Sequence, residues 1–263
     1  MKQKIAVFDI DDTLLPYGQE KLSLLHLYAL RELKKDCILV LATGRNLSSI
    51  PTHIIQDIQP DYFITINGHA IYNNKKEVLF IKRLNPELLL SLLHDCVKLN
   101  FILTFKFTDE HVVAHCPLNQ KLSSNLKHIH DPETVLNNHE APCGAFLINN
   151  DVPITDLIHT YSPFTFAKAG RNGYEIYDST IDKSTGVQFI LNKLNMNWSQ
   201  VLAFGDSEND IPLLTKAKLG FAMENAQDFV KGCSNHVIGS CNEDGIYYAL
   251  LNLNMIHEYK KKD

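Results

Sequence analysis

Near its N-terminus the chain reads Ile5-Ala6-Val7-Phe8-Asp9-Ile10-Asp11-Asp12-Thr13. The apolar run predicts a strand over 4–9, and it ends in an Asp-x-Asp-x-Thr turn. In open α/β sheets the carboxyl ends of the strands are where ligands bind. Two carboxylates this close repel each other, and a cation between them relieves the repulsion. The stretch therefore indicates a metal ion, an anionic chemistry and a nucleophile.

The composition is that of a soluble globular protein. The chain has 263 residues, of which 45% are hydrophobic and 21% charged, enough for one large or two ordinary domains. The formal net charge of −5 argues against a protein that binds nucleic acid or a membrane surface, because such proteins carry basic patches. We expect the partner to be a small molecule, and the protein to be a monomer or a weak homodimer.

The sequence also does not predict a targeting signal or a membrane span. Lys2 and Lys4 precede only a short apolar run, which does not predict a signal peptide, and no stretch reaches the roughly 20 apolar residues of a membrane span. The six cysteines are scattered without a C-x-x-C pair, which is typical of reduced thiols. These observations predict a cytoplasmic protein.

Strands and helices alternate at both ends of the chain, and this predicts a parallel sheet. The first part predicts strands over 4–9, 37–42 and 61–66 and helices over 20–34 and 46–56. The last part predicts helices over 184–194, 211–215, 226–231 and 244–253 and strands over 201–204, 219–222 and 237–238.

The middle of the chain has a different pattern, because its strands come in adjacent pairs. Helices are predicted over 86–99, 118–129 and 154–161, strands over 101–107, 111–116 and 144–148, and a hairpin over 165–177. We therefore expect a three-layer α/β/α core with a central parallel sheet, built from 1–82 and 183–263. An antiparallel α+β cap domain, 83–182, is expected to be inserted in it.

Four separated segments place polar residues at the ends of predicted core elements: Asp9/Asp11/Thr13, Thr43-Gly44-Arg45, Lys183, and Gly205-Asp206-Ser207-Glu208-Asn209-Asp210. Each alone has an ordinary explanation as a polar turn, a helix cap or a solvated lysine. Together, and in this order, they resemble the four motifs of the haloacid-dehalogenase (HAD) superfamily of phosphotransferases. The Cof-type subgroup of sugar-phosphatase-like hydrolases is the closer resemblance, through Ile66-Asn67-Gly68, Ala222-Met223-Glu224-Asn225-Ala226 and the position of the inserted cap.

The resemblance implies a Rossmann-like core and a Mg²⁺-dependent phosphatase. Asp9 would be the nucleophile that forms an aspartyl-phosphate, and Asp11 the general acid and base. Mg²⁺ would be held by the Asp9 carboxylate, the Asp11 backbone carbonyl and the Asp206 carboxylate, with Asp210 nearby.

The same resemblance implies a set of phosphate-binding residues: Thr13, Thr43, Gly44, Arg45, Lys183 and Asn209. Further candidates for substrate contacts are Asn67 and Gly68, which end a core strand, and Arg171, at the tip of the cap hairpin.

These residue types suit phosphoryl transfer. A carboxylate that approaches a phosphate dianion is repelled, by about 4 kcal/mol for two unit charges 4 Å apart at an effective dielectric constant of 20. Mg²⁺ and Lys183 would offset this repulsion. Within the superfamily that the chain resembles, an acid at the position of Asp11 suits hydrolysis, because water must be activated there, whereas members with a threonine at that position have a long-lived acyl-phosphate.

Two alternatives remain open from the sequence. A phosphomutase also needs an acid at Asp11, and a non-catalytic protein that binds phosphorylated metabolites could keep the fold. Sugar phosphates are the expected substrates, with nucleotides, flavin mononucleotide and pyridoxal phosphate as other options.

Overall fold

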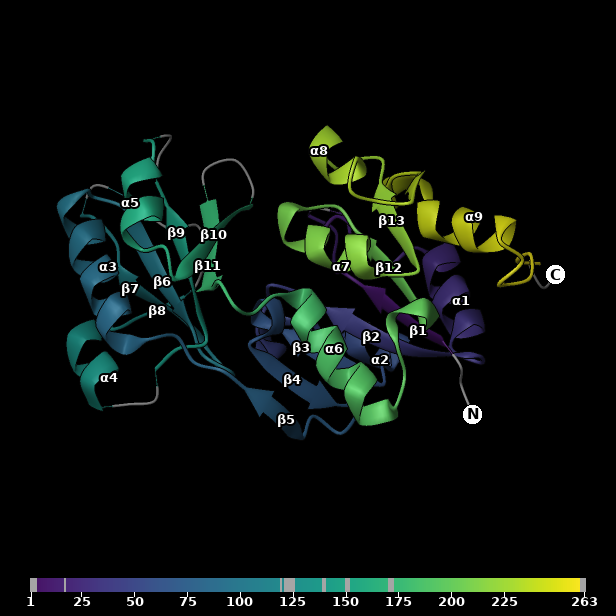
Figure 1. Ribbon diagram of the computed structural model, residues 1–263, viewed down its shortest axis with the longest axis horizontal. Helices are drawn as coiled ribbons and strands as arrows, with labels where there is room; N and C mark the ends of the chain where they lie inside the picture. Colours follow the sequence, from purple (N-terminus) through teal and green to yellow (C-terminus); the bar gives the residue numbers. More distant parts are fainter. Residues whose placement is uncertain are drawn as a thin grey trace.

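The computed structural model consists of two sheets, each with its own helices (Figure 1). It describes residues 4–16, 18–118, 120, 126–138, 141–149, 152–169 and 173–260. The larger sheet is built from both ends of the described chain, and the smaller one from its middle. The part from 86 to 178, with the smaller sheet, is called the cap below, and the rest is called the core.

The core sheet has eight strands in the order β14-β13-β12-β1-β2-β3-β4-β5. Their bounds are β14 His236–Ile238, β13 Leu219–Met223, β12 Val201–Gly205, β1 Lys4–Phe8, β2 Cys37–Ala42, β3 Tyr62–Thr65, β4 Ala70–Asn73 and β5 Val78–Ile81. The strands from β14 to β3 pair in parallel, and β4 and β5 add an antiparallel edge. The α/β fold with a central parallel sheet is confirmed, but the sequence did not predict the four-residue strands β4 and β5.

Helices cover both faces of the core sheet, so its central strands are continuous apolar runs. One face packs on α1 Leu24–Leu33, α2 Thr52–Ile58 and α9 Gly245–Asn252. The other packs on α6 Lys183–Leu194, α7 Ile211–Lys216 and α8 Asp228–Lys231. Across the first face the rings of Phe8, Phe204 and Phe221 stack with centroids 4.7 Å apart at each step. The predicted three layers are therefore present.

The cap sheet has the order β10-β11-β9-β6-β7-β8. Its strands are β10 Phe164–Ala169, β11 Gly173–Asp178, β9 Gly144–Ile148, β6 Ile102–Lys106, β7 His111–His115 and β8 Lys127–His128, and its helices are α3 Pro86–Lys98, α4 Pro132–Asn138 and α5 Thr155–Thr160. Leu103, Phe105 and Leu147 point from one face of the sheet into a core that these helices share. The alternate residues of the same strands therefore face the other way, toward the site described below.

Two details of the cap differ from the sequence prediction. The predicted helix over 118–129 is wrong at its end, because Lys127 and His128 form β8 and pair in parallel with β7. The residues 119 and 121–125 of that prediction lie outside the described part. Helix α4 was not predicted. Pairing with a distant strand outweighs the local helical spacing of 118–129, as tertiary context commonly does.

The segments 82–85 and 179–182 join the core and the cap, and polar contacts hold these two linkers together. Lys82 Nζ donates to Thr180 Oγ1 at 2.7 Å and lies 3.2 Å from Asp178 Oδ2. The buried His69 ring adds a second link: Nδ1 lies 3.0 Å from the Ile66 carbonyl, and Nε2 accepts from the Asp178 N–H at 3.2 Å. These two bonds require a neutral ring with the proton on Nδ1.

His69 should make the protein less stable in mild acid. Its burial lowers the pKa to about 4, below the ordinary 6.5. In the unfolded chain the His69 ring is protonated below pH 6.5, whereas in the folded protein it stays neutral down to about pH 4. The free energy of unfolding therefore falls as the pH falls through this window. At about 1.4 kcal/mol per pKa unit, the loss from pH 7 to pH 5 is about 2 kcal/mol.

Urea unfolding of the wild type and of His69→Phe at both pH values measures this loss. The variant is expected to be less stable at pH 7 but to lose about 2 kcal/mol less between pH 7 and pH 5. An equal loss in both proteins would exclude His69 as its source. His257→Phe, at an exposed position, serves as the matched control.

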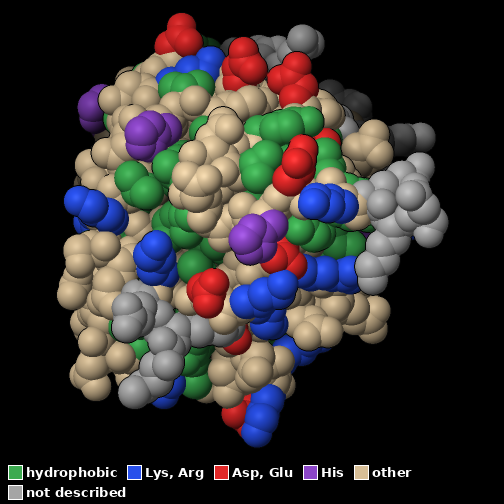
Figure 2. Space-filling view, turned by 90° about the vertical axis from the view of Figure 1, so that its right-hand side faces the viewer, with side chains coloured by type: hydrophobic (Ala, Val, Ile, Leu, Met, Phe, Trp, Pro, Cys, Tyr) green, Lys and Arg blue, Asp and Glu red, His purple; other side chains and the backbone are tan. Residues whose placement is uncertain are grey.

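Within the described residues, none of the helices has the length and apolar character needed to cross a membrane. Figure 2 shows one end of the molecule, where basic and acidic side chains are interspersed with apolar and neutral ones.

Candidate active site

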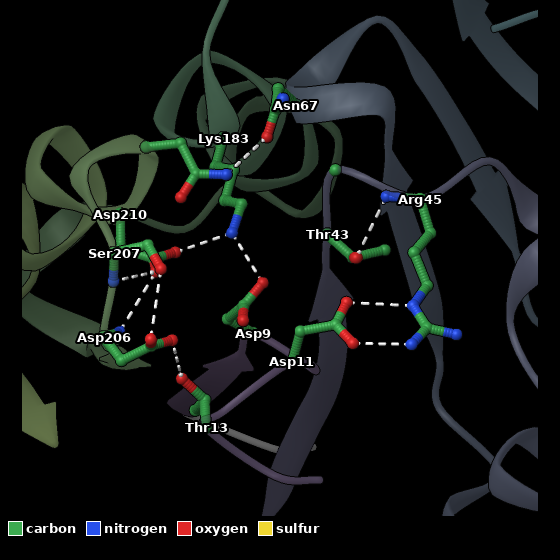
Figure 3. A network of polar contacts seen from close by, with 12 residues as sticks. Asp9, Asp11, Thr13, Thr43, Arg45, Asn67, Lys183, Asp206, Ser207 and Asp210 are labelled. Carbon is green, nitrogen blue, oxygen red and sulfur yellow. Dashed lines mark hydrogen bonds and ion pairs between the residues drawn. The ribbon is translucent and has the colours of Figure 1, made fainter. Parts of the chain in front are cut away.

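The sequence motifs converge at the carboxyl edge of the core sheet (Figure 3). Asp9 directly follows β1, Thr43 follows β2 and Asp206 follows β12. These three strands are neighbours or next neighbours in the sheet. Parallel strands end at the same edge, and so residues almost 200 positions apart in the sequence come together.

Lys183 is the buried cation of the site. Its Nζ donates to Asp9 Oδ1 at 2.6 Å and to Asp210 Oδ1 at 2.7 Å, and its side chain is 1% exposed. It is the first residue of α6, whose N-cap Asp182 forms a capping box with Thr185. A cation is unfavourable at the positive end of a helix dipole. The two carboxylates are what hold Lys183 there.

The carboxylates carry more negative charge than Lys183 compensates. Burial, with Asp210, Asp206 and Asp11 nearby, raises the pKa of Asp9 well above its ordinary value despite the opposing effect of Lys183. Burial and the charge of Asp210 raise the pKa of Asp206 to about 7. Burial alone would lower the pKa of Lys183, but Asp210 and Asp9 raise it above its ordinary value. A further cation at this position would relieve the excess.

Oxygen donors are available for such a cation. Among the described residues, Asp9, Asp206 and Asp210 offer carboxylate oxygens that all lie within 4.8 Å of one another. Hard cations such as Mg²⁺ prefer oxygen ligands of this kind. The donor set and its excess charge therefore fit the metal ion that the sequence motifs imply.

The Asp210 carboxylate already accepts hydrogen bonds from other groups of the protein. Besides Lys183, its carboxylate accepts the backbone N–H groups of Asp206 and Ser207, both at 3.1 Å. Gly205 makes room for it, because a Cβ there would lie 2.5 Å from the Asp210 carboxyl carbon. Asp210 thus shapes the loop that carries Asp206. Thr13, predicted to bind phosphate, donates to Asp206 Oδ1 at 2.9 Å and so orients the same carboxylate.

Asp11 points away from Asp9 and pairs with Arg45. Arg45 Nε lies 2.9 Å from Asp11 Oδ2, and the second guanidinium nitrogen lies 2.5 Å from Oδ1. The sequence predicted that Arg45 binds phosphate; in the structure its fork holds the predicted acid and base. The backbone of the same turn is folded by Thr43, whose buried hydroxyl accepts the Arg45 N–H at 3.1 Å.

The candidate substrate contacts have different positions. Asn67 is buried, has a left-handed φ of 53°, and accepts from Asn209 Nδ2 at 2.9 Å. Its own Nδ2 is buried with no hydrogen-bond partner among the described residues. Gly68 packs on the backbone, since a Cβ there would lie 2.2 Å from the Asp182 carbonyl, and this role is structural. Arg171 lies outside the described residues.

A cavity of about 360 Å³ lies between core and cap at this edge. Asp9, Asp11 and Arg45 line it from the core, and Lys106 and Glu175 line it from the cap. The sequence prediction left Glu175 without a role and did not consider Lys106. The alternation Leu103-Thr104-Phe105-Lys106 was the available signal, because it places Lys106 on the face opposite the apolar residues.

Comparison with known proteins gives the family. The sequence model of the haloacid dehalogenase-like hydrolases matches residues 6–250. The chain is 24% identical over 251 residues to a Bacillus subtilis enzyme named 5-amino-6-(5-phospho-D-ribitylamino)uracil phosphatase, covering 94% of each chain.

Solved structures share the fold over nearly the whole chain. A hypothetical protein from Geobacillus kaustophilus has 26% identity and a TM-score of 0.81, with 97% of this chain and 100% of that chain covered. The sugar phosphatase BT4131 of HAD subclass IIB has 21% identity and a TM-score of 0.87, covering 96% and 100%. The family match spans most of the chain and the relatives are named phosphatases, so the chain belongs to the haloacid dehalogenase-like hydrolases and is a phosphatase of that family.

Proposed function

We propose that this protein is a Mg²⁺-dependent phosphomonoesterase that hydrolyses small phosphorylated metabolites, sugar phosphates foremost, through an aspartyl-phosphate. The observation that carries the proposal is the buried Asp9 carboxylate, which is bonded to Lys183 and opens on a cavity of metabolite size. We propose a cytoplasmic enzyme that acts on free metabolites and needs neither a membrane nor a nucleic-acid partner.

The residues supply two proton-balanced displacements. In the first, an Asp9 carboxylate oxygen attacks phosphorus, the ester P–O bond breaks, and Asp11 in its acid form gives its proton to the departing alkoxide. In the second, Asp11 takes a proton from water, the water oxygen attacks phosphorus, and the bond to Asp9 breaks. In this structure the fork of Arg45 binds both oxygens of the Asp11 carboxylate, so one of these two bonds must open before Asp11 carries a proton.

Several groups of the site would compensate the negative charge of the phosphate. Lys183 neutralises Asp9, and the Thr43 hydroxyl and the Gly44 N–H belong to the turn that would receive phosphate oxygens. Asp9, Asp206 and the Asp11 backbone carbonyl would hold Mg²⁺, while Asp210 holds the Asp206 loop. When bound, Mg²⁺ would neutralise part of the charge that the phosphate and the carboxylates share.

The substrate class is supported from two sides. One similar protein is named a sugar phosphatase and another a phosphatase of a ribityl compound. Both names describe substrates that are rich in hydroxyl groups. On the cap side the cavity is lined by a mixture of polar and apolar groups: two lysines, a glutamate, the Phe146 ring and two alanines.

Removal of the metal tests the proposal. The purified protein is assayed on p-nitrophenyl phosphate with Mg²⁺ and after treatment with EDTA. Loss of one preorganised charge contact costs about 2.7–4 kcal/mol of transition-state stabilisation, and we expect the rate to fall at least about 100-fold and to return when Mg²⁺ is added back. Equal rates with and without metal would refute metal dependence.

A further inference from the structure

The cap sheet turns a polar and hollowed face toward Asp9. Ala167, Glu175, Phe146 and Thr104 lie side by side across β10, β11, β9 and β6. Lys106 is two residues beyond Thr104 and therefore shares this face. The alternate residues pack into the apolar core of the cap.

Small residues make room on this face. A Cβ at Gly173 would lie 2.3 Å from the Phe146 ring, and one at Gly144 would lie 2.6 Å from Ile66 of the core. The face therefore carries three large groups, Lys106, Phe146 and Glu175, between small ones. All three line the cavity that contains Asp9 and Asp11.

Lys106 and Glu175 form a buried ion pair in this cavity. Lys106 Nζ lies 2.6 Å from both Glu175 carboxylate oxygens, and the side chains are 7% and 14% exposed. Nζ also donates to the Gly44 carbonyl at 2.9 Å, which places the pair directly beside the turn that carries Thr43 and Arg45.

Stability does not explain such a pair. Two buried charges lose their hydration, and well-packed apolar residues of similar size are commonly as stable or more stable. The pair has hydrogen-bonding capacity left, because a carboxylate has about four acceptor positions and two are used. The three N–H groups of the Lys106 ammonium are already used by the two Glu175 oxygens and the Gly44 carbonyl, so a substrate hydroxyl would donate to the free acceptor positions of Glu175.

We propose that Glu175, held in place by Lys106, determines specificity by binding hydroxyl groups of the leaving alcohol, with the Phe146 ring along its carbon chain. This inference rests on the proposed phosphomonoesterase activity and names its substrate class: phosphate monoesters of polyols or sugars. The pair is neutral as a whole, and hence it selects polar, uncharged alcohols.

The test compares substrates that differ only in hydroxyl groups. Phosphate release is measured from ribitol 5-phosphate against n-pentyl phosphate, and from glucitol 6-phosphate against n-hexyl phosphate. The wild type is expected to prefer at least one polyol ester over its alkyl partner by tenfold or more in kcat/KM. In Glu175→Gln, and in the double variant Lys106→Met/Glu175→Leu, that preference should fall at least tenfold, mainly through KM.

The double variant replaces both charges together, so neither remains unpaired, and Glu175→Gln decides the question if the double variant does not fold. Ser48→Ala is the matched control. It removes a bond from Ser48 Oγ to the Asp109 carbonyl, a contact between core and cap outside the cavity, and should keep the wild-type preference.

The outcomes separate the two proposals. A wild type that prefers neither polyol ester, or variants that lose activity on polyol and alkyl esters by the same factor, would overturn the role of the pair. A wild type that hydrolyses none of the esters, nor p-nitrophenyl phosphate, would instead refute the phosphomonoesterase activity.

Discussion

Asp9→Asn is expected to abolish phosphatase activity while the protein remains folded. The amide has the same shape, and its oxygen can still accept from Lys183, but it cannot form an aspartyl-phosphate. Removal of a covalent nucleophile commonly costs about 10⁴-fold or more in kcat, and we expect a loss of at least that size on p-nitrophenyl phosphate.

The same variant should be at least as stable as the wild type when metal is absent. Burial and three neighbouring acids raise the pKa of Asp9, which means that its charged form is disfavoured in the folded protein. Thermal unfolding in EDTA measures this. A melting temperature clearly below that of the wild type would contradict the excess of negative charge. Asp36→Asn is the control for activity, because Asp36 is exposed and precedes β2 at the opposite edge of the sheet.

Lys183→Met should lose both activity and stability. The side chain is buried against Asp9 and Asp210, and removal of one partner of a buried ion pair costs about 3–5 kcal/mol because the remaining charges lack compensation. Activity should fall by at least about 100-fold, since the contact with the nucleophile and its charge are both lost. Urea unfolding and kcat/KM on p-nitrophenyl phosphate give the two values.

A second substitution separates the two losses. In Lys183→Met/Asp210→Asn the amide oxygen can keep the N–H groups of Asp206 and Ser207, and its NH₂ group replaces Oδ1, the oxygen that accepted from Lys183. Stability should then recover by more than half of the loss, while activity stays low. Recovery of activity together with stability would show that Lys183 acts only in folding.

The sequence predicted the core of the site because its signals are local. Asp9 and Asp206 each follow a buried apolar strand, and strands of a parallel sheet end at one edge, so their convergence follows from topology alone. Lys183 could be placed by its position between the cap and a predicted helix. The identity of the fold needed no knowledge of side-chain contacts.

Other features depend on contacts that only the folded chain creates. Lys106 and Glu175 are 69 positions apart and meet because β9 lies between their strands. The ion pair of Arg45 with Asp11 joins residues 34 positions apart, while phosphate binding by Arg45 stays a prediction. The end of the helix predicted over 118–129 instead forms β8, which pairs with β7. In each case a distant partner outweighs the local pattern.

The way in which the two linkers are fastened limits how the cap can move. Lys82, Asp178 and His69 tie both linkers together at one place, so a rotation of the cap would have a short axis there. Parts far from that axis would travel furthest, among them Lys168, whose N–H contacts Glu208 of the core. Opening would then be a hinge rotation, with large displacements at the end of β10 and small ones beside Gly68. Backbone amide exchange should therefore be fastest in the contacts near Lys168.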